Sequence, residues 1–156
     1  MRLKTYLDAL KKSQVNIKKS MRTISELIVH CTATPEGKYF DASHIDKWHK
    51  QRGWSGIGYH FVVLLDGTIE YGRDLNKVGA HTKGKNSTSI GITYVGGMDA
   101  DMKHAKDTRT EAQKESLLLL LKTLKKLHPE AVVYGHRDFS TKACPSFDAK
   151  TEYADI

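Results

Sequence analysis

The sequence predicts a single α/β domain with a central mixed β-sheet flanked by helices. Two observations predict this class: short apolar runs typical of buried strands, and segments whose apolar residues recur with helical spacing. The strand-like runs occupy residues 27–31, 61–65, 68–71, 89–95 and 131–135. Because two long helical segments lie between these runs, helices on both faces of the sheet are expected. The 156 residues suffice for one domain with an ordinary core.

Two helices are expected from their capping signals. The first is predicted to begin at Ser43, with Asp46 as its capping partner three residues later, and to end at Gly53. The second follows a capping box formed by Thr110 and Gln113. Its apolar face is expected to bury five leucines before Pro129 ends the helix: Leu117, Leu120, Leu121, Leu124 and Leu127.

The clearest hairpin signal joins the apolar runs 61–65 and 68–71. Asp66-Gly67 stands between them, and this dipeptide is typical of tight turns between antiparallel strands. The run 89–95 is a further strand, closed by Gly96-Gly97, and the polar stretch after it is expected to be a loop up to Arg109.

Two of the strand-like runs lead to candidate metal ligands. The run 27–31 carries His30, and the run 131–135 is followed by His136 and, in a loop, Cys144. If the two strands are neighbours, both imidazoles emerge at one edge of the sheet and the loop brings the thiol to them. Imidazole nitrogen and thiolate are favoured zinc ligands. Three protein ligands with one open position are typical of a catalytic zinc site.

A disulfide between Cys31 and Cys144 is the alternative use of the two cysteines. It would remove the thiolate that the metal site needs. Strand alternation argues against it, because His30 and Cys31 should face opposite sides of the sheet.

Five motifs in order resemble the zinc-dependent N-acetylmuramoyl-L-alanine amidases, a family that includes small phage amidases and animal peptidoglycan-recognition proteins. The resemblance runs from about residue 25 to about residue 150, and the first two dozen residues match nothing in it. The motifs are Val29-His30-Cys31-Thr32-Ala33-Thr34, Gly58-Tyr59-His60-Phe61, Gly79-Ala80-His81-Thr82 with Asn86, Ser89-Ile90-Gly91-Ile92, and Lys142-Ala143-Cys144-Pro145-Ser146-Phe147-Asp148.

The resemblance implies roles for particular residues. The family's zinc ligands fall on His30, His136 and Cys144, and the catalytic residues of its phage branch fall on Tyr59 and Lys142. A Cys as third ligand resembles the phage and peptidoglycan-recognition branches rather than the bacterial recycling amidases, which use Asp. One Zn²⁺ is therefore the expected cofactor.

Simpler interpretations of these residues remain open on the sequence alone. Tyr59 is also compatible with an aromatic residue at the rim of a site, and Lys142 with a solvated loop charge. Three further residues, His81, Thr82 and Asn86, resemble the groove wall that holds the stem peptide of the substrate in this family. Each is expected to bind substrate.

Four other histidines are not expected to bind metal. His60 should face away from Tyr59 and be a packed, hydrogen-bonded core residue. His44 and His49 on the first helix are interpreted as surface or boundary residues, and His104 as an inert loop residue.

Positive charge is concentrated in residues 1–22, which we expect to be a basic, helical extension of an amidase domain over residues 23–156. These 22 residues hold seven basic side chains and one acid of the chain's 25 and 18, so the remainder is nearly neutral. The extension either packs on the domain or frays in solvent, or it draws the domain to an anionic wall polymer or membrane surface. Helical spacing is shown by Leu3, Tyr6, Leu7 and Leu10.

The charge distribution argues against specific nucleic-acid binding, because the presumed domain is nearly neutral. No apolar stretch in residues 1–22 reaches the roughly 7–15 residues of a signal peptide. The leucine run 117–121 is too short to span a bilayer. We therefore expect a monomer, synthesised in the cytoplasm without a signal peptide, that acts on the bacterial cell wall.

The expected function is hydrolysis of the N-acetylmuramoyl–L-alanine bond of peptidoglycan, in a phage or prophage lysis enzyme. A non-catalytic peptidoglycan-binding module of the same fold is the alternative. Retention of Cys144, Tyr59 and Lys142 favours the enzyme. No serine-hydrolase, phosphate-binding or dinucleotide-binding motif is present.

Overall fold

A five-stranded β-sheet forms the centre of this computed structural model, which describes residues 17–156. The strand order is β4-β3-β5-β1-β7. β4 is antiparallel to β3, whereas β3, β5, β1 and β7 are mutually parallel, so the sheet is mixed as predicted. The strands are β1 (Glu26–Cys31), β3 (Phe61–Val63), β4 (Ile69–Tyr71), β5 (Ser89–Tyr94) and β7 (Val132–Gly135).

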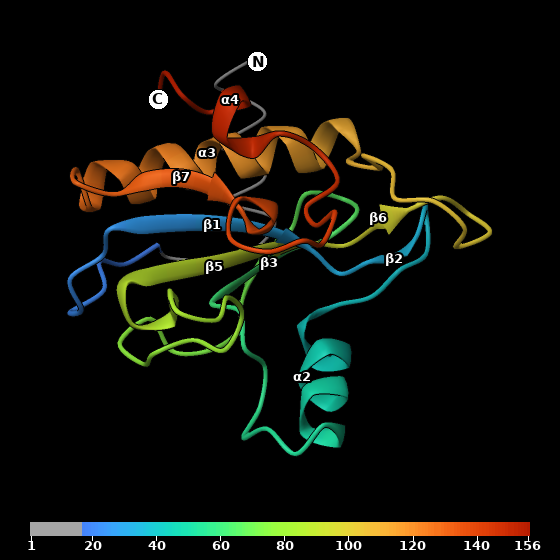
Figure 1. Cartoon of the computed structure of the whole chain (residues 1–156), viewed down its shortest axis with the longest axis horizontal. Helices are drawn as coiled ribbons and strands as arrows, with labels where there is room; N and C mark the ends of the chain where they lie inside the picture. The colour runs from blue at the N-terminus through green and yellow to red at the C-terminus, as the bar shows by residue number, and fades with distance from the viewer. Residues whose placement is uncertain (1–16) are drawn as a thin grey trace.

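Helices lie on both faces of this sheet (Figure 1). The long helix α3 (Glu111–Leu127) and the short C-terminal helix α4 (Ala149–Glu152) cover one face, and α2 (Ala42–Gln51) lies on the other. The larger core forms between the sheet and α3. A second, two-stranded sheet pairs β2 (Thr34–Pro35) with β6 (Gly97–Met98) beyond the carboxyl ends of β1 and β5. One short 3₁₀ helix, η1 (Asn86–Thr88), precedes β5, and another, η2 (His136–Asp138), follows β7.

The signals for α3 are confirmed. Gln113 N donates to Thr110 Oγ1 at 3.0 Å, and Thr110 N donates to Gln113 Oε1 at 2.9 Å, which forms the predicted capping box. The helix ends at Leu127, two residues before Pro129. Leu117, Leu120, Leu121 and Leu124 are fully buried, whereas Leu127 in the last turn is only partly buried.

The predicted start of α2 is wrong by one residue, and its capping pair is a different one. Asp41 is the N-cap: its carboxylate accepts from the backbone N–H groups of Ser43 and His44, and the His44 side chain pairs back with Asp41 N. An aspartate caps as well as a serine, so the sequence offered two equivalent starts. Asp46 instead accepts from Ile57 N at 2.8 Å, which fastens the chain after the helix.

The predicted hairpin forms between β3 and β4, with Gly67 at φ +88° in its turn. β3 ends at Val63, earlier than the apolar run predicts, because Leu64 N already bonds across the turn to Thr68 O. The predicted loop after Gly97 begins with the short strand β6, and Met98 bridges to Ala105.

Most of the helical extension expected over residues 1–22 lies outside the described residues, and its described part is not helical. Residues 17–22 contain no helix, and two of their side chains bond to the domain. Ser20 Oγ donates to Leu75 O at 2.7 Å, and Arg22 Nη2 donates to Ser89 O at 3.0 Å.

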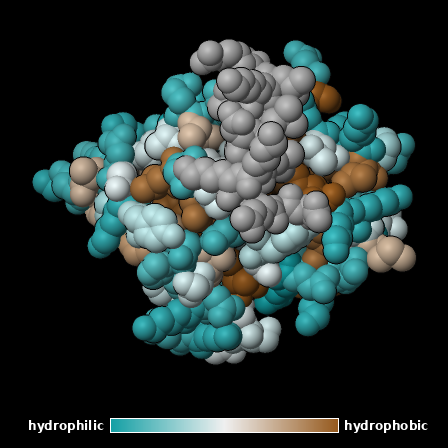
Figure 2. Space-filling model, turned by 180° about the vertical axis from the view of Figure 1, so that it is seen from behind, coloured by the Kyte–Doolittle hydropathy of each residue, from teal (hydrophilic) through white to brown (hydrophobic). Residues whose placement is uncertain are grey.

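Seen from behind, the surface of the molecule is largely hydrophilic with separate hydrophobic patches (Figure 2). Among residues 17–156, no helix has the length and apolar character needed to cross a bilayer.

Candidate metal and catalytic site

The three predicted metal ligands come together at the carboxyl edge of the sheet. His30 stands near the end of β1, His136 opens η2 directly after β7, and Cys144 lies in the loop that follows. One ligand atom from each residue lies within 4.8 Å of the other two. The His30 and His136 ring centroids are 4.6 Å apart, and Cys144 Sγ is 3.8 Å from His30 Nδ1. The parallel pairing of β1 with β7 brings both histidines to this edge.

β7 ends before β1 does, and this difference in length affects the surroundings of the Cys144 sulfur. β7 pairs with β1 only as far as Val29 and Gly135, so the next amide facing β7, that of Cys31, has no strand partner. Cys31 N donates instead to Cys144 Sγ at 3.2 Å. The backbone of β1 therefore donates a hydrogen bond to the sulfur of Cys144, which the loop after β7 carries.

Both imidazoles are electrostatically suited to bind a cation. Burial lowers the pKa of His30 well below its ordinary value, and the nearby His81, His136 and Lys142 lower it further. Burial and Lys142 also lower the pKa of His136. Both rings are thus neutral at pH 7, and a neutral imidazole has a free nitrogen lone pair for a metal.

The Cys144 thiol also fits a metal site. Its hydrogen-bonded contact with the Cys31 thiol and its burial raise the pKa of Cys144, so the thiolate form needs a compensating positive charge. A divalent ion between sulfur and two neutral imidazoles supplies that charge. This donor set of two nitrogens and one sulfur suits zinc. Both cysteines are free thiols, and Cys31 packs into the core on the α3 side.

Tyr59 and Lys142 lie beside the three candidate ligands. The Tyr59 ring, two residues before β3, is 4.9 Å from the His30 ring. Burial and the nearby Cys144 raise the pKa of Tyr59, so its phenol stays protonated and can donate. Lys142 is exposed on the loop, and its positive charge acts on the pKa values of both His30 and His136.

Two of the three predicted substrate-binding residues, His81 and Thr82, lie directly against His30, and Asn86 holds the turn that carries them. Asn86 Oδ1 accepts from the backbone N–H groups of His81 and Thr82, both at 2.9 Å. His81 Nδ1 lies 2.8 Å from His30 Nε2, and Thr82 Oγ1 lies 3.3 Å from the same atom. No sequence pattern predicts this contact of His81 with His30, nor that of Ser89 Oγ, 3.3 Å from His81 Nε2.

Comparisons with known proteins bear on this geometry. Residues 20–147 match the family of N-acetylmuramoyl-L-alanine amidases. The endolysin of Klebsiella phage KP32 is 46% identical over 126 residues, 81% of this chain and 83% of that protein. The endolysin of Escherichia phage T7 is 43% identical over 132 residues, 85% of this chain and 87% of that protein.

A solved structure is also similar. The N-acetylmuramoyl-L-alanine amidase LysC from Clostridium intestinale URNW superposes with a TM-score of 0.71 at 31% identity, covering 88% of this chain and 90% of that one. This chain belongs to the N-acetylmuramoyl-L-alanine amidase family. The predicted family, fold class and peptidoglycan amidase function are therefore confirmed.

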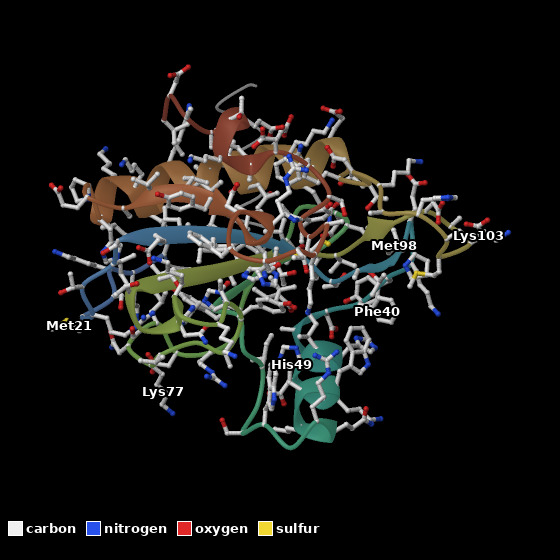
Figure 3. The ribbon with its side chains drawn as sticks, in the orientation of Figure 1. Met21, Phe40, His49, Lys77, Met98 and Lys103 are labelled. Carbon is white, nitrogen blue, oxygen red and sulfur yellow. The ribbon has the colours of Figure 1, made fainter. Side chains whose placement is uncertain are left out.

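Three further histidines of this amidase lie outside the group of candidate ligands: His60 and His49 are buried, and His104 is exposed. His60 is fully buried and accepts from Gly91 N through Nδ1 at 3.1 Å, as predicted. His49 is more buried than predicted: burial lowers its pKa to about 4, and its Nδ1 accepts from Gly58 N at 2.9 Å. Figure 3 shows His49 on α2 and Lys103, the neighbour of exposed His104, on a distant loop.

Proposed function

We propose that this amidase uses one zinc ion, held by His30, His136 and Cys144, to hydrolyse the bond between the lactyl group of N-acetylmuramic acid and L-alanine. We further propose that it acts on the bacterial cell wall as the lysis enzyme of a phage or prophage. The observation that supports the zinc site most strongly is the approach of three ligand atoms to within 4.8 Å at one edge of the sheet.

Each ligand residue has a defined part in holding the ion. His30 and His136 bind as neutral imidazoles, since the pKa of each is lowered by burial. Cys144 binds as thiolate, with an N–H donor from Cys31. When bound, zinc supplies a Lewis acid and lowers the pKa of a water molecule to about 7.

Tyr59 and Lys142 act on the reacting amide. Attack on an amide carbonyl develops negative charge on its oxygen, which a cation placed in advance stabilises. Lys142 carries that charge on the loop next to His136 and Cys144. The Tyr59 phenol remains protonated and donates a hydrogen bond or a proton to the reacting groups.

Substrate binding is proposed for the turn that holds His81, Thr82 and Asn86, next to His30. The partner is peptidoglycan, whose stem peptide would run past this turn. The protein is proposed to do this as a monomer and without specific binding of nucleic acid.

The function is tested by incubating purified protein with cell-wall sacculi and measuring new N-terminal alanine. Release is expected from the zinc-loaded protein, with loss after chelation and recovery when zinc is restored. A His104→Ala variant, altered on an exposed loop, is the matched control and should keep full activity. Binding to sacculi without release of N-terminal alanine would reject the hydrolase and favour a binding module.

A further inference from the structure

We infer that His81 is a positioning residue that fixes the tautomer and the ring orientation of the metal ligand His30. This inference rests on the proposed zinc site, and it assigns His81 a role distinct from contact with the stem peptide. Its basis is a series of hydrogen-bonded side chains that runs from His30 to His81 and on to Ser89. Once zinc occupies Nδ1 of His30, the donor and the acceptor of each of these bonds follow in turn.

The tautomer of His30 follows from which nitrogen faces the other ligands. Nδ1 lies 3.8 Å from Cys144 Sγ, so Nδ1 is the atom that would bind zinc. A metal-binding nitrogen carries no proton, and the proton of neutral His30 therefore sits on Nε2. Nε2–H then donates to His81 Nδ1, 2.8 Å away.

The position of the proton on His81 follows from its contact with His30. Because Nδ1 of His81 accepts, its own proton must sit on Nε2, which lies 3.3 Å from Ser89 Oγ and can donate to it. Thr82 Oγ1 lies 2.9 Å from His81 Nδ1 and 3.3 Å from His30 Nε2, beside the bond between the two rings. With zinc on Nδ1 of His30, this arrangement gives the Nε2–H tautomer of His30 an acceptor.

The fold makes room for the His81 ring in this position. A Cβ atom added at Gly91 of β5 would lie 2.5 Å from His81 Cδ2, and one added at Gly79 would lie 2.7 Å from it. The ring packs edge-on against His30, with centroids 4.8 Å apart. Asn86 Oδ1 fixes the backbone of the turn through the N–H group of His81 at 2.9 Å. The imidazole thus occupies a slot in the sheet face that only glycine leaves open.

An imidazole acceptor has a chemical consequence that a carboxylate would not have. Histidine ligands of metals commonly donate to a carboxylate or a carbonyl, which orients the ring and raises its basicity. Here the acceptor is a ring nitrogen of His81, and an imidazole acceptor carries no negative charge. The ligand is oriented without adding a negative charge, so a zinc site with a single thiolate keeps more of its positive charge.

Zinc affinity distinguishes positioning from peptide contact. In His81→Leu, the zinc dissociation constant measured by chelator competition should rise about 10–100-fold. His81→Asn should recover most of this loss, because its Oδ1 can replace Nδ1 as the acceptor for His30. A residue that only contacts the peptide would change KM and leave zinc affinity intact. Equal zinc affinity in wild type and His81→Leu would overturn the inference.

A measurement on the unaltered protein keeps the inference testable if His81→Leu does not fold. In the zinc-loaded protein, ¹⁵N-resolved NMR of the imidazoles should show His30 protonated at Nε2 and bound through Nδ1. A proton on Nδ1 of His30 would overturn the inference. Neither readout depends on peptidoglycan cleavage, so a protein that binds zinc but releases no alanine would fail the proposed function alone.

Discussion

The two halves of the candidate site are built in different ways. His30 belongs to β1, which is bonded to β5 on one side and β7 on the other, and its outer nitrogen is held by His81. His136 and Cys144 belong to the segment that leaves edge strand β7, and so does Lys142. One half is therefore positioned by the sheet, and the other depends on how its loop is fastened.

The loop half is fastened by long-range contacts to the sheet and to the C-terminal helix. Tyr94 Oη donates to Pro145 O at 2.7 Å, and Ser146 Oγ donates to Gly97 O at 2.8 Å. Phe147 lies under the guanidinium of Arg109, 3.4 Å from ring centroid to Cζ. Arg109 is itself bonded to Asp107, Glu152 and Tyr153. This comparison predicts that the two halves will respond differently to substitution.

The largest effect is expected from removing the sulfur of the loop half. Cys144→Ala leaves two imidazoles, too few to retain a catalytic zinc ion, so zinc content and amidase activity should be lost together. Metal analysis after gel filtration and alanine release from sacculi measure both. Full zinc content in Cys144→Ala would show that this sulfur is not a ligand.

Lys142→Ala should separate charge stabilisation from metal binding within the same loop. The rate is expected to fall about 10²–10³-fold, the typical cost of removing one donor to an oxyanion. Zinc affinity should stay unchanged, because Lys142 is not among the clustered ligand atoms. Lys103→Ala, on the distant loop in Figure 3, is the matched control. Unchanged turnover in Lys142→Ala would remove this residue from the mechanism.

Arg109→Met tests how far the loop half depends on its anchor. The free energy of unfolding in urea should fall by about 2–3 kcal/mol, since charged hydrogen bonds to Asp107 and Glu152 are lost from a guanidinium whose side chain is 2% exposed. The reactivity of the Cys144 thiol should rise as its loop loosens. Lys114→Met removes a nearby surface cation and should cost less than about 0.5 kcal/mol. Equal stability losses in the two variants would contradict this account.

Acid should destabilise the fold around the site through two buried histidines, His60 and His49. Burial lowers the pKa of His60 and of His49 to about 4, so the unfolded chain takes up protons below about pH 6.5 and the folded one does not. Stability is thus complete above pH 6.5 and falls as the pH drops towards 4, by up to about 1.4 kcal/mol per pH unit for each histidine. Urea unfolding at pH 7, 6 and 5 measures the slope. His60→Gln should reduce this slope by up to about 1.4 kcal/mol per pH unit.

The same division explains what the sequence could predict. The approach of His30 to His136 follows from two apolar runs that each lead to a histidine, because parallel neighbours end at one edge. The contact of His81 with His30 joins residues 51 positions apart through a turn, and no periodic pattern encodes it. Asp41 was missed as a cap because Ser43 carries the same local signal.

Local patterns thus predicted most of the elements and the approach of the two candidate histidine ligands. They did not predict side-chain contacts between elements, which depend on packing. The pattern of apolar residues does not indicate that Gly91 leaves space for the His81 ring. The significance of Gly91 depends on the shape of the space above it, which only the folded sheet defines.

The early end of β7 gives the candidate sulfur ligand, Cys144, a hydrogen-bond donor that most substitutions cannot remove. The group that donates to Cys144 Sγ is the main-chain amide of residue 31, so Ser, Ala or Val at that position would keep it. Proline alone lacks this hydrogen. Any amino acid other than proline at position 31 therefore keeps the N–H group that donates to Cys144 Sγ.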